Sequence, residues 1–186
     1  MDISRALIRR CKKNDKAALN ELLRQYEQYL YKICYYYCQD KDEAFDICQE
    51  VYIRIFRHMA SLDEDRPIVP WLKRLAVNTC LNYKRDHRKV VPVSLDGNPA
   101  LMQGVTTSDS VEEIAMSHND ENVLSSALAS LADNQRMALT LRYVEDLSYE
   151  EIAHTMELPL GTVKSHIFRG RNALREILRT SDLVEG

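Results

Sequence analysis

Glycine and proline are scarce in this chain, and it has no long apolar run. The 186 residues include only 5 Gly and 5 Pro while 45% are hydrophobic, a composition that favours helices over an all-β fold. No segment approaches the roughly 20 apolar residues that a membrane-spanning helix requires. The beginning of the chain, MDISRALIRRCKKNDK, lacks the apolar core of a signal peptide. We therefore expect an all-α protein that acts in the cytoplasm.

The cysteines are odd in number and form no C-x-x-C pair, so nothing indicates a disulfide framework. Cys34 and Cys38 lie four residues apart and could share a metal, but no His lies in that stretch, and cysteine is often buried as a small hydrophobe. We expect buried, reduced thiols, no metal and no cofactor. The cysteines concerned are Cys11, Cys34, Cys38, Cys48 and Cys80.

The sequence also lacks the usual signs of an enzyme. It shows no nucleophile paired with a base, no metal-ligand spacing and no phosphate-binding loop. An enzyme that used the cysteines with His58, His87 or His154 remains a rival hypothesis, and stoichiometric zinc in the purified protein would support it. We predict that the chain is not an enzyme.

Charge is distributed unevenly along the chain, although the net charge is only −3. Residues 71–89 hold six Lys or Arg against one acid, residues 90–135 hold seven acids and no Lys or Arg, and five of the seven later basic residues lie in 164–179. Two basic segments on either side of an acidic spacer indicate two nucleic-acid contacts on one chain.

Apolar spacing and turn signals predict two small helical domains. Helices are expected over 3–13, 16–38, 42–59 and 70–88, and again over 121–131 and 134–144. Residues 90–109 have Pro, Gly, Ser and Thr without a period and are interpreted as a flexible linker. A capping-box signal at residues 110–113 restarts the helices. The predicted domains are therefore 1–89 and 110–186.

The most informative segment is SYEEIAHTMELPLGTVKSHIFRGR, residues 148–171. Ser148 and Glu151 form a capping-box pattern at the start of one helix, and Pro159 suits the first turn of a second. This spacing is typical of a helix-turn-helix, whose second helix enters the DNA major groove. On a helical wheel one arc of that second helix should pack against the first: Val163, Ile167, Gly170, Leu174 and Leu178.

The opposite side of the second helix carries cations and an exposed aromatic. Phe168 could contact a thymine methyl, while Lys164 and Arg169 could reach base edges or phosphates. The simpler interpretation is a solvated basic face with a stray Phe. Because cap, turn and basic face coincide, we favour DNA binding.

Two further helices carry candidate surfaces. Along 71–85, Trp71, Arg74, Asn78, Asn82 and Arg85 form one stripe beside a buried arc of Leu72, Leu75, Ala76, Thr79 and Tyr83. An aromatic, two cations and two carboxamides suit single-stranded DNA, although Trp71 could equally pack in the core. Along 42–58, an apolar arc lies opposite a protein-docking or merely solvated face: Asp46, Gln49, Glu50, Ile53 and Arg57.

These segments, in this order, resemble the bacterial extracytoplasmic-function sigma factors, which belong to the sigma-70 family. The resemblance covers nearly the whole chain: DEAFDICQEVYIRIFRHM resembles the polymerase-docking helix, WLKRLAVNTCLNYKRDHRK the −10 segment, and residues 148–171 the −35 reader. It implies a region-two domain and a region-four domain. It also implies a transcription initiation factor that binds core RNA polymerase and directs it to promoters.

The resemblance assigns roles to particular residues. Core polymerase, mainly the β′ clamp helices, would be held by Asp46, Gln49, Glu50 and Ile53. The −10 element would be melted and read by Trp71, Arg74, Asn78, Asn82 and Arg85, with the loop 61–69 helping to form a pocket for a flipped base. The −35 duplex would be read by Thr162, Lys164, Ser165, His166, Phe168 and Arg169.

The sequence departs from the family at two places. His166 stands where the family often has Arg, and a neutral imidazole would weaken phosphate binding there. The loop DEDRPIV, residues 63–69, is more acidic than expected for a loop that faces DNA. The resemblance further implies an anti-sigma partner, often membrane-bound, and no small-molecule substrate. The alternative is a stand-alone helix-turn-helix regulator, which would bind its operator without polymerase.

Overall fold

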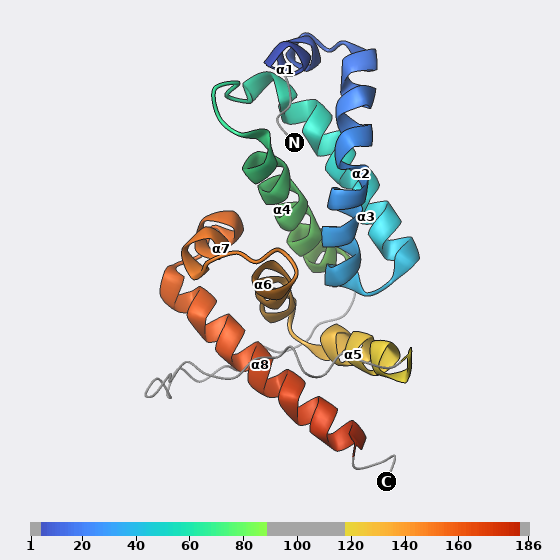
Figure 1. Cartoon of the computed structure of the whole chain (residues 1–186), viewed down its shortest axis with the longest axis vertical. Helices are drawn as coiled ribbons and strands as arrows, with labels where there is room; N and C mark the ends of the chain where they lie inside the picture. Colours follow the sequence, from blue (N-terminus) through green and yellow to red (C-terminus); the bar gives the residue numbers. More distant parts are fainter. Residues whose placement is uncertain (1–4, 89–117, 183–186) are drawn as a thin grey trace.

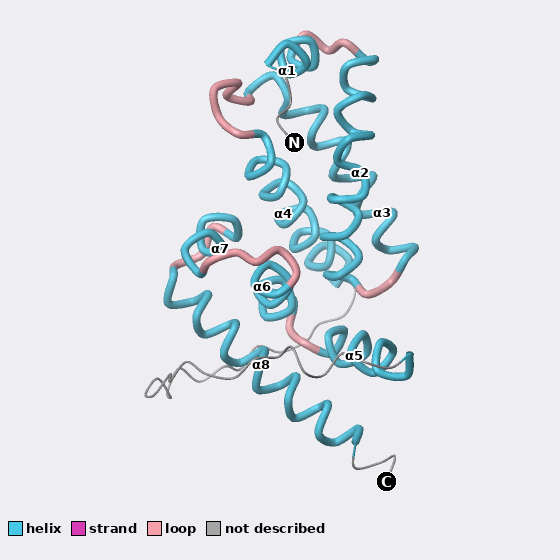
Figure 2. The backbone as a smooth tube through the Cα atoms, viewed as in Figure 1, coloured by secondary structure: helices cyan, strands magenta, loops and turns pink. Residues whose placement is uncertain are grey.

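The computed structural model describes residues 5–88 and 118–182, which form helices joined by short turns (Figures 1 and 2). The expected all-α fold is confirmed, and the described ranges contain no strand. The predicted linker 90–109 and the capping-box signal at 110–113 lie outside the described residues. The elements are α1 (Arg5–Lys12), α2 (Lys16–Cys38), α3 (Lys41–His58), the 3-10 turn η1 (Met59–Ser61), α4 (Ile68–Arg88), α5 (His118–Ser130), α6 (Asp133–Tyr143), α7 (Tyr149–Met156) and α8 (Leu160–Asp182).

Side-chain caps set several of these helix starts. Asp15 accepts hydrogen bonds from the backbone N–H groups of Ala17 and Ala18 at the start of α2, and Asp40 accepts one from Glu43 at the start of α3. Such caps satisfy backbone donors that have no partner inside the helix. Because capping depends on neighbours in the sequence, these boundaries could be predicted closely.

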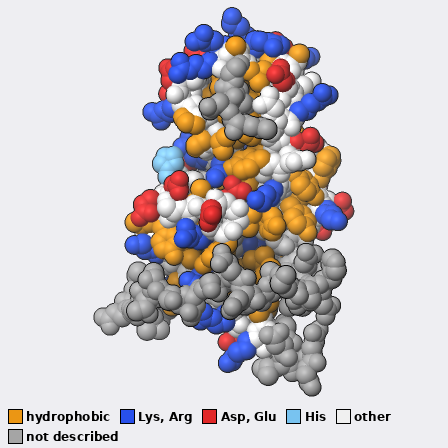
Figure 3. Space-filling view, viewed as in Figure 1, with side chains coloured by type: hydrophobic (Ala, Val, Ile, Leu, Met, Phe, Trp, Pro, Cys, Tyr) orange, Lys and Arg blue, Asp and Glu red, His pale blue; other side chains and the backbone are white. Residues whose placement is uncertain are grey.

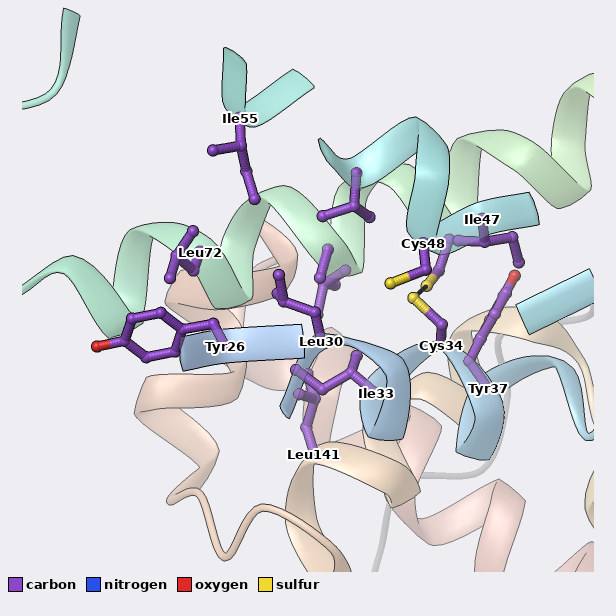
Figure 4. Close-up of a cluster of buried hydrophobic side chains, with 14 of the residues drawn as sticks. Tyr26, Leu30, Ile33, Cys34, Tyr37, Ile47, Cys48, Ile55, Leu72 and Leu141 are labelled. Atoms are coloured by element: carbon purple, nitrogen blue, oxygen red, sulfur yellow. Dashed lines mark hydrogen bonds between the residues drawn. The ribbon is translucent and has the colours of Figure 1, made fainter. Parts of the chain in front are cut away.

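Helices α1 to α4, with η1, form an N-terminal bundle around a continuous apolar core. Leu30, Ile33, Ile47, Ile55 and Leu72 are fully buried where α2, α3 and α4 meet (Figure 4). The predicted arc of α4 is confirmed in part, because Leu75 and Tyr83 are only half-buried. Val77 and Cys80 are also fully buried, which the prediction missed. Helix α4 is buried over a wider arc because it contacts helices on two sides.

All five cysteines are buried and free. The sulfur atoms of Cys34 and Cys80 lie 4.0 Å apart, and the Cys34 and Cys48 side chains point toward each other (Figure 4). A hydrogen bond with Cys34, together with burial, raises the pKa of Cys48. The Cys48 thiol therefore stays protonated, and the buried cysteines pack as core residues. In the described part of the chain no three His, Cys, Asp or Glu side chains are grouped to hold a metal ion.

Helices α5 to α8 form a C-terminal bundle in which α8 is the longest element (Figure 1). The predicted apolar arc of α8 is buried at Val163, Ile167 and Leu174. Helix α8 packs on α7, as predicted, and also on α6, which was not predicted. The reason is Gly170, since a Cβ at this position would lie 3.0 Å from Cδ1 of Leu139 on α6.

Replacing Gly170 by valine should therefore destabilise the protein. The added side chain would meet Leu139, and overpacking of this kind costs about 1–3 kcal/mol. Gly161, near the start of the same helix, serves as the matched site, because a Cβ added there would meet nothing within 4 Å. Urea unfolding should show a lower midpoint for G170V and little loss for G161V. Equal midpoints would contradict the close packing of α8 on α6.

The two bundles pack directly against each other in this structure. Helices α2 and α4 contact α6, and α4 also contacts α7. Leu141 of α6 is fully buried in the same apolar cluster as Leu30 and Ile33 of α2 (Figure 4). This arrangement could not be predicted, because it joins residues far apart in the sequence; Leu141 lies more than 100 positions from Leu30 and Ile33. None of the helices in the described ranges combines the length and apolar character needed to cross a membrane.

Candidate nucleic-acid interface

Helices α7 and α8 form the predicted helix-turn-helix. The Ser148 hydroxyl accepts from the backbone N–H of Glu151, and the Glu151 carboxylate accepts from the backbone N–H of Ser148 at 2.8 Å, so the capping box is complete. These hydrogen bonds hold the pKa of Glu151 below its usual value. Glu157 ends α7 in the left-handed conformation with φ 55°, and the carbonyl of Pro159 accepts the first hydrogen bonds of α8.

The outer face of α8 presents the side chains that the wheel predicted. Lys164 and Arg169 are exposed, and Phe168 is 47% exposed although it is a large apolar residue. Val163 and Ile167, on the opposite side, are buried. Two cations and a solvent-facing aromatic therefore lie on one face of a well-anchored helix.

The stripe on α4 lies partly against the C-terminal bundle. Four residues of the stripe are half-buried and the fifth, Arg85, is exposed; the half-buried ones are Trp71, Arg74, Asn78 and Asn82. Trp71 packs against the core and is still partly exposed to solvent. The Arg74 guanidinium lies 3.8 Å from the carboxylate of Glu157 at the end of α7.

The outward side of α3 borders a shallow groove of about 340 Å³ between α3 and α4. All four residues predicted to dock polymerase line it, and Ile53 is 44% exposed. Three more lining residues were not predicted: Arg54 of α3, and Thr79 and Tyr83 of α4. The two α4 residues could not be predicted because they lie far from α3 in the sequence. The lining residues are Asp46, Gln49, Glu50, Ile53, Arg54, Thr79 and Tyr83.

The chain matches two family models, described as Sigma-70 region 2 over residues 22–90 and Sigma-70, region 4 over residues 121–174. It is 34% identical over 179 residues to the ECF RNA polymerase sigma factor SigW of Bacillus subtilis, covering 92% of this chain and 95% of that protein. The chain belongs to the extracytoplasmic-function sigma factors.

A second relative agrees with this assignment, and a solved structure shares the fold. The ECF RNA polymerase sigma-E factor of Escherichia coli K12 is 34% identical over 177 residues, which cover 90% of each chain. The sigma factor RpoE from Bartonella quintana, solved in complex with the anti-sigma factor NepR, has the same fold, with a TM-score of 0.62, 22% identity, and coverage of 86% of this chain and 96% of that one. A sigma factor directs RNA polymerase to promoters and is not itself an enzyme.

Three of the residues predicted to read the −35 duplex are less available in this sigma factor than Lys164, Phe168 and Arg169. Thr162, Ser165 and His166 are half-buried on α8. The Ser165 hydroxyl donates to the carbonyl of Gly161 at 2.9 Å, so it can offer DNA only its acceptor. Burial, and then the nearby Arg169, lower the pKa of His166, so its imidazole is neutral at pH 7. Its contact with a phosphate would be weak.

The unexpected acidity of the loop before α4 has a structural cause in this sigma factor. Glu64 accepts from the Arg9 guanidinium at 2.9 Å, and Asp65 lies 3.6 Å from Arg5. Lys and Arg side chains gather at this end of the molecule, over α1 (Figure 3). The hydrogen bond from Arg9 lowers the pKa of Glu64. The acids therefore attach the loop to α1.

On α3 the sigma factor exposes two aromatic side chains that sequence reasoning missed. Phe45 is 59% exposed and Phe56 is 52% exposed, both on α3. Phe56 also lines a second, smaller groove of about 200 Å³ between α2 and α3. The two residues are eleven positions apart, close to three helical turns, so the spacing alone places them on the same face of α3.

Proposed function

We propose that this sigma factor contacts a promoter at two places while it is docked on core RNA polymerase. The exposed face of α8 reads the −35 duplex, and the stripe on α4 melts and reads the −10 element. The α3 side of the α3–α4 groove binds polymerase, mainly its β′ clamp helices. The observation that carries this proposal is the exposed aromatic of α8 between two cations, on a helix anchored by a complete capping box.

On the −35 element, the contacts follow from the chemistry of the exposed side chains. Lys164 and Arg169 neutralise phosphates or donate to guanine acceptors, and Phe168 packs on a thymine methyl. Thr162, Ser165 and His166 flank them and contribute weaker contacts. This division agrees with the greater exposure of the first three residues.

On the −10 element, the α4 stripe supplies one group of each kind that unpaired bases need. Trp71 stacks on a base, a contact worth ~1–3 kcal/mol. Asn78 and Asn82 hydrogen-bond base edges, while Arg74 and Arg85 neutralise the backbone. Flipping a base costs a few kcal/mol of unstacking, and a pocket around Asn78 recovers part of that cost.

The proposed roles belong to three consecutive segments of the chain. Residues 1–89 act as the region-two domain, 90–109 as a linker and 110–186 as the region-four domain. The protein acts in the cytoplasm, and an anti-sigma factor, which in this family is often membrane-bound, covers both DNA-binding faces. The complex of Bartonella quintana RpoE with NepR supports an inhibitor of this kind.

Transcription in vitro tests the proposal. Purified protein added to core polymerase should yield promoter-specific transcripts from a pool of genomic DNA. The stand-alone regulator predicts instead tight operator binding in a gel shift without polymerase. Absence of transcripts from the whole pool, with an active core enzyme, would count against the proposal.

Replacing Arg169 by alanine should weaken binding to the −35 duplex by about 5- to 150-fold, because losing a base contact costs ~1–3 kcal/mol. The matched control is R179A. Arg179 is also exposed on α8, ten residues after Arg169, and its guanidinium pairs with the carboxylate of Glu176 at 3.0 Å. Holoenzyme binding to promoter fragments that differ at −35 provides the measurement. An unchanged −35 preference in R169A would remove Arg169 from the reading face.

A further inference from the structure

A buried carboxylate joins the two bundles. Glu145, in the turn between α6 and α7, has a side chain only 7% exposed. One of its oxygens lies 3.2 Å from Nζ of Lys73 on α4, and the other lies 3.8 Å from Nζ of Lys32 on α2. Lys32 also donates to the carbonyl of Val144 at 3.3 Å. Three charged groups from α2, α4 and the α6–α7 turn therefore meet at one point.

The surroundings of Glu145 distinguish it from an ordinary surface ion pair. The Lys73 side chain is 12% exposed, and its ammonium lies 6.0 Å from the centre of the Tyr29 ring. Burial, and then the Glu145 carboxylate, raise the pKa of Tyr29. A charge this buried is costly unless it is paired, so removing one partner destabilises the contact strongly. The Arg74–Glu157 pair nearby is far more exposed and contributes little.

Apolar and polar contacts surround the Glu145 pair and make the interface continuous. Leu141 enters the core of the N-terminal bundle. The Thr140 hydroxyl lies 3.5 Å from the carbonyl of Tyr36, and the Arg136 guanidinium lies 5.0 Å from the centre of the Tyr37 ring. The bundles are therefore held by a packed interface with Glu145 at its charged edge.

This closed arrangement does not fit simultaneous binding of two promoter elements. The −35 and −10 positions are about 25 base pairs apart, or roughly 85 Å along B-DNA at ~3.4 Å per base pair. A compact chain of this length has a radius of gyration of about 16 Å and is roughly 40 Å across. Helix α7 also packs against α4, whose stripe includes Arg74. The bundles must separate before α4 and α8 can both engage.

We propose that Glu145, with Lys32 and Lys73, is an autoinhibitory latch that holds the free sigma factor closed and covers part of the α4 face. The proposal rests on the proposed function, because it assumes that α4 binds single-stranded DNA. Docking on core polymerase opens the latch, so the free protein has little affinity for the −10 strand. The apparent affinity is reduced by the fraction of molecules that are open.

The E145Q variant tests the latch directly, because it keeps the side-chain size and removes the charge. The free variant should have a larger radius of gyration by small-angle X-ray scattering than the wild type. It should also bind a short fluorescent single strand of randomised sequence about fivefold or more tightly. The matched control is E150Q, since Glu150 is exposed on α7 and loses the same charge. It should leave both measurements unchanged.

Two further variants separate the latch from a general loss of stability. Exchanging all three charges in K32E/K73E/E145K should restore the wild-type radius of gyration, because the charge at position 145 would again lie between two opposite charges. If circular dichroism shows that E145Q has lost helix, K32Q/K73Q removes the same ion pairs from the other side and should open the chain. A wild-type radius in a folded E145Q, or in a folded K32Q/K73Q, would overturn the latch.

Failure of the proposed function would look different. If neither wild type nor E145Q supports promoter-specific transcription with core polymerase, the assignment to promoter contacts fails, while the radius of gyration still reports on the latch. If both support transcription and the radius does not change, the latch alone fails.

Discussion

Replacing Arg136 by alanine is expected to destabilise the folded chain by about 3–5 kcal/mol, because it removes one partner of a buried, hydrogen-bonded ion pair. The Arg136 side chain is 2% exposed. It donates to the carbonyls of Leu128 and Ala129 at the end of α5 and to the carboxylate of Asp133 at 2.8 Å. Its guanidinium also lies over Tyr37 of α2. The change would leave these acceptors unsatisfied and open a cavity where the bundles meet.

Urea unfolding followed by circular dichroism measures this effect, and two variants give it a scale. R179A, at an exposed position of α8, should shift the midpoint little. R136K keeps the charge but loses the planar guanidinium that reaches several acceptors at once. Its urea midpoint should therefore lie between those of the wild type and R136A. An R136A midpoint equal to that of R179A would contradict the structural role of Arg136.

Replacing Ile53 by aspartate should weaken binding to core polymerase by about 30-fold or more, the loss typical of a hot-spot residue. Ile53 is 44% exposed at the edge of the α3–α4 groove, so the change should leave the fold intact. It places a charge where we propose that an apolar contact forms. Titration of core polymerase with fluorescent sigma factor gives the affinity.

Phe168, which is similarly exposed, provides the reciprocal control. F168D also introduces aspartate at an exposed apolar position, 47% exposed, but on α8. It should retain core binding and lose −35 recognition in the holoenzyme. If I53D binds core polymerase normally, the docking surface lies elsewhere. If both variants lose core binding, the effect is not specific to the α3 face.

Local features made much of the fold predictable. The bounds of α2 were predicted to the residue, because a capping Asp precedes the helix and the apolar spacing persists along it. The Ser148–Glu151 capping box was predicted in full for the same reason. The start of α4 was less accurate, at Pro70 instead of Ile68, since proline is tolerated anywhere in a first turn.

The candidate surfaces were predictable only as faces of single helices. Periodicity placed Lys164, Phe168 and Arg169 on one side of α8, and the structure leaves them exposed. Periodicity could not show that Thr79 and Tyr83 of α4 share a groove with α3. It also could not show why the loop before α4 is acidic, because its partners Arg5 and Arg9 lie on α1.

The sequence by itself determined the helical class, the helix caps, the helix-turn-helix and the sigma-factor family, because each depends on residues that are close along the chain. Only the tertiary structure decided that the two bundles meet face to face and that Glu145 is buried between Lys32 and Lys73. An acidic residue in a turn has no sequence pattern that reveals its partner. Its pairing is set by where two distant helices bring their lysines, and that follows from packing.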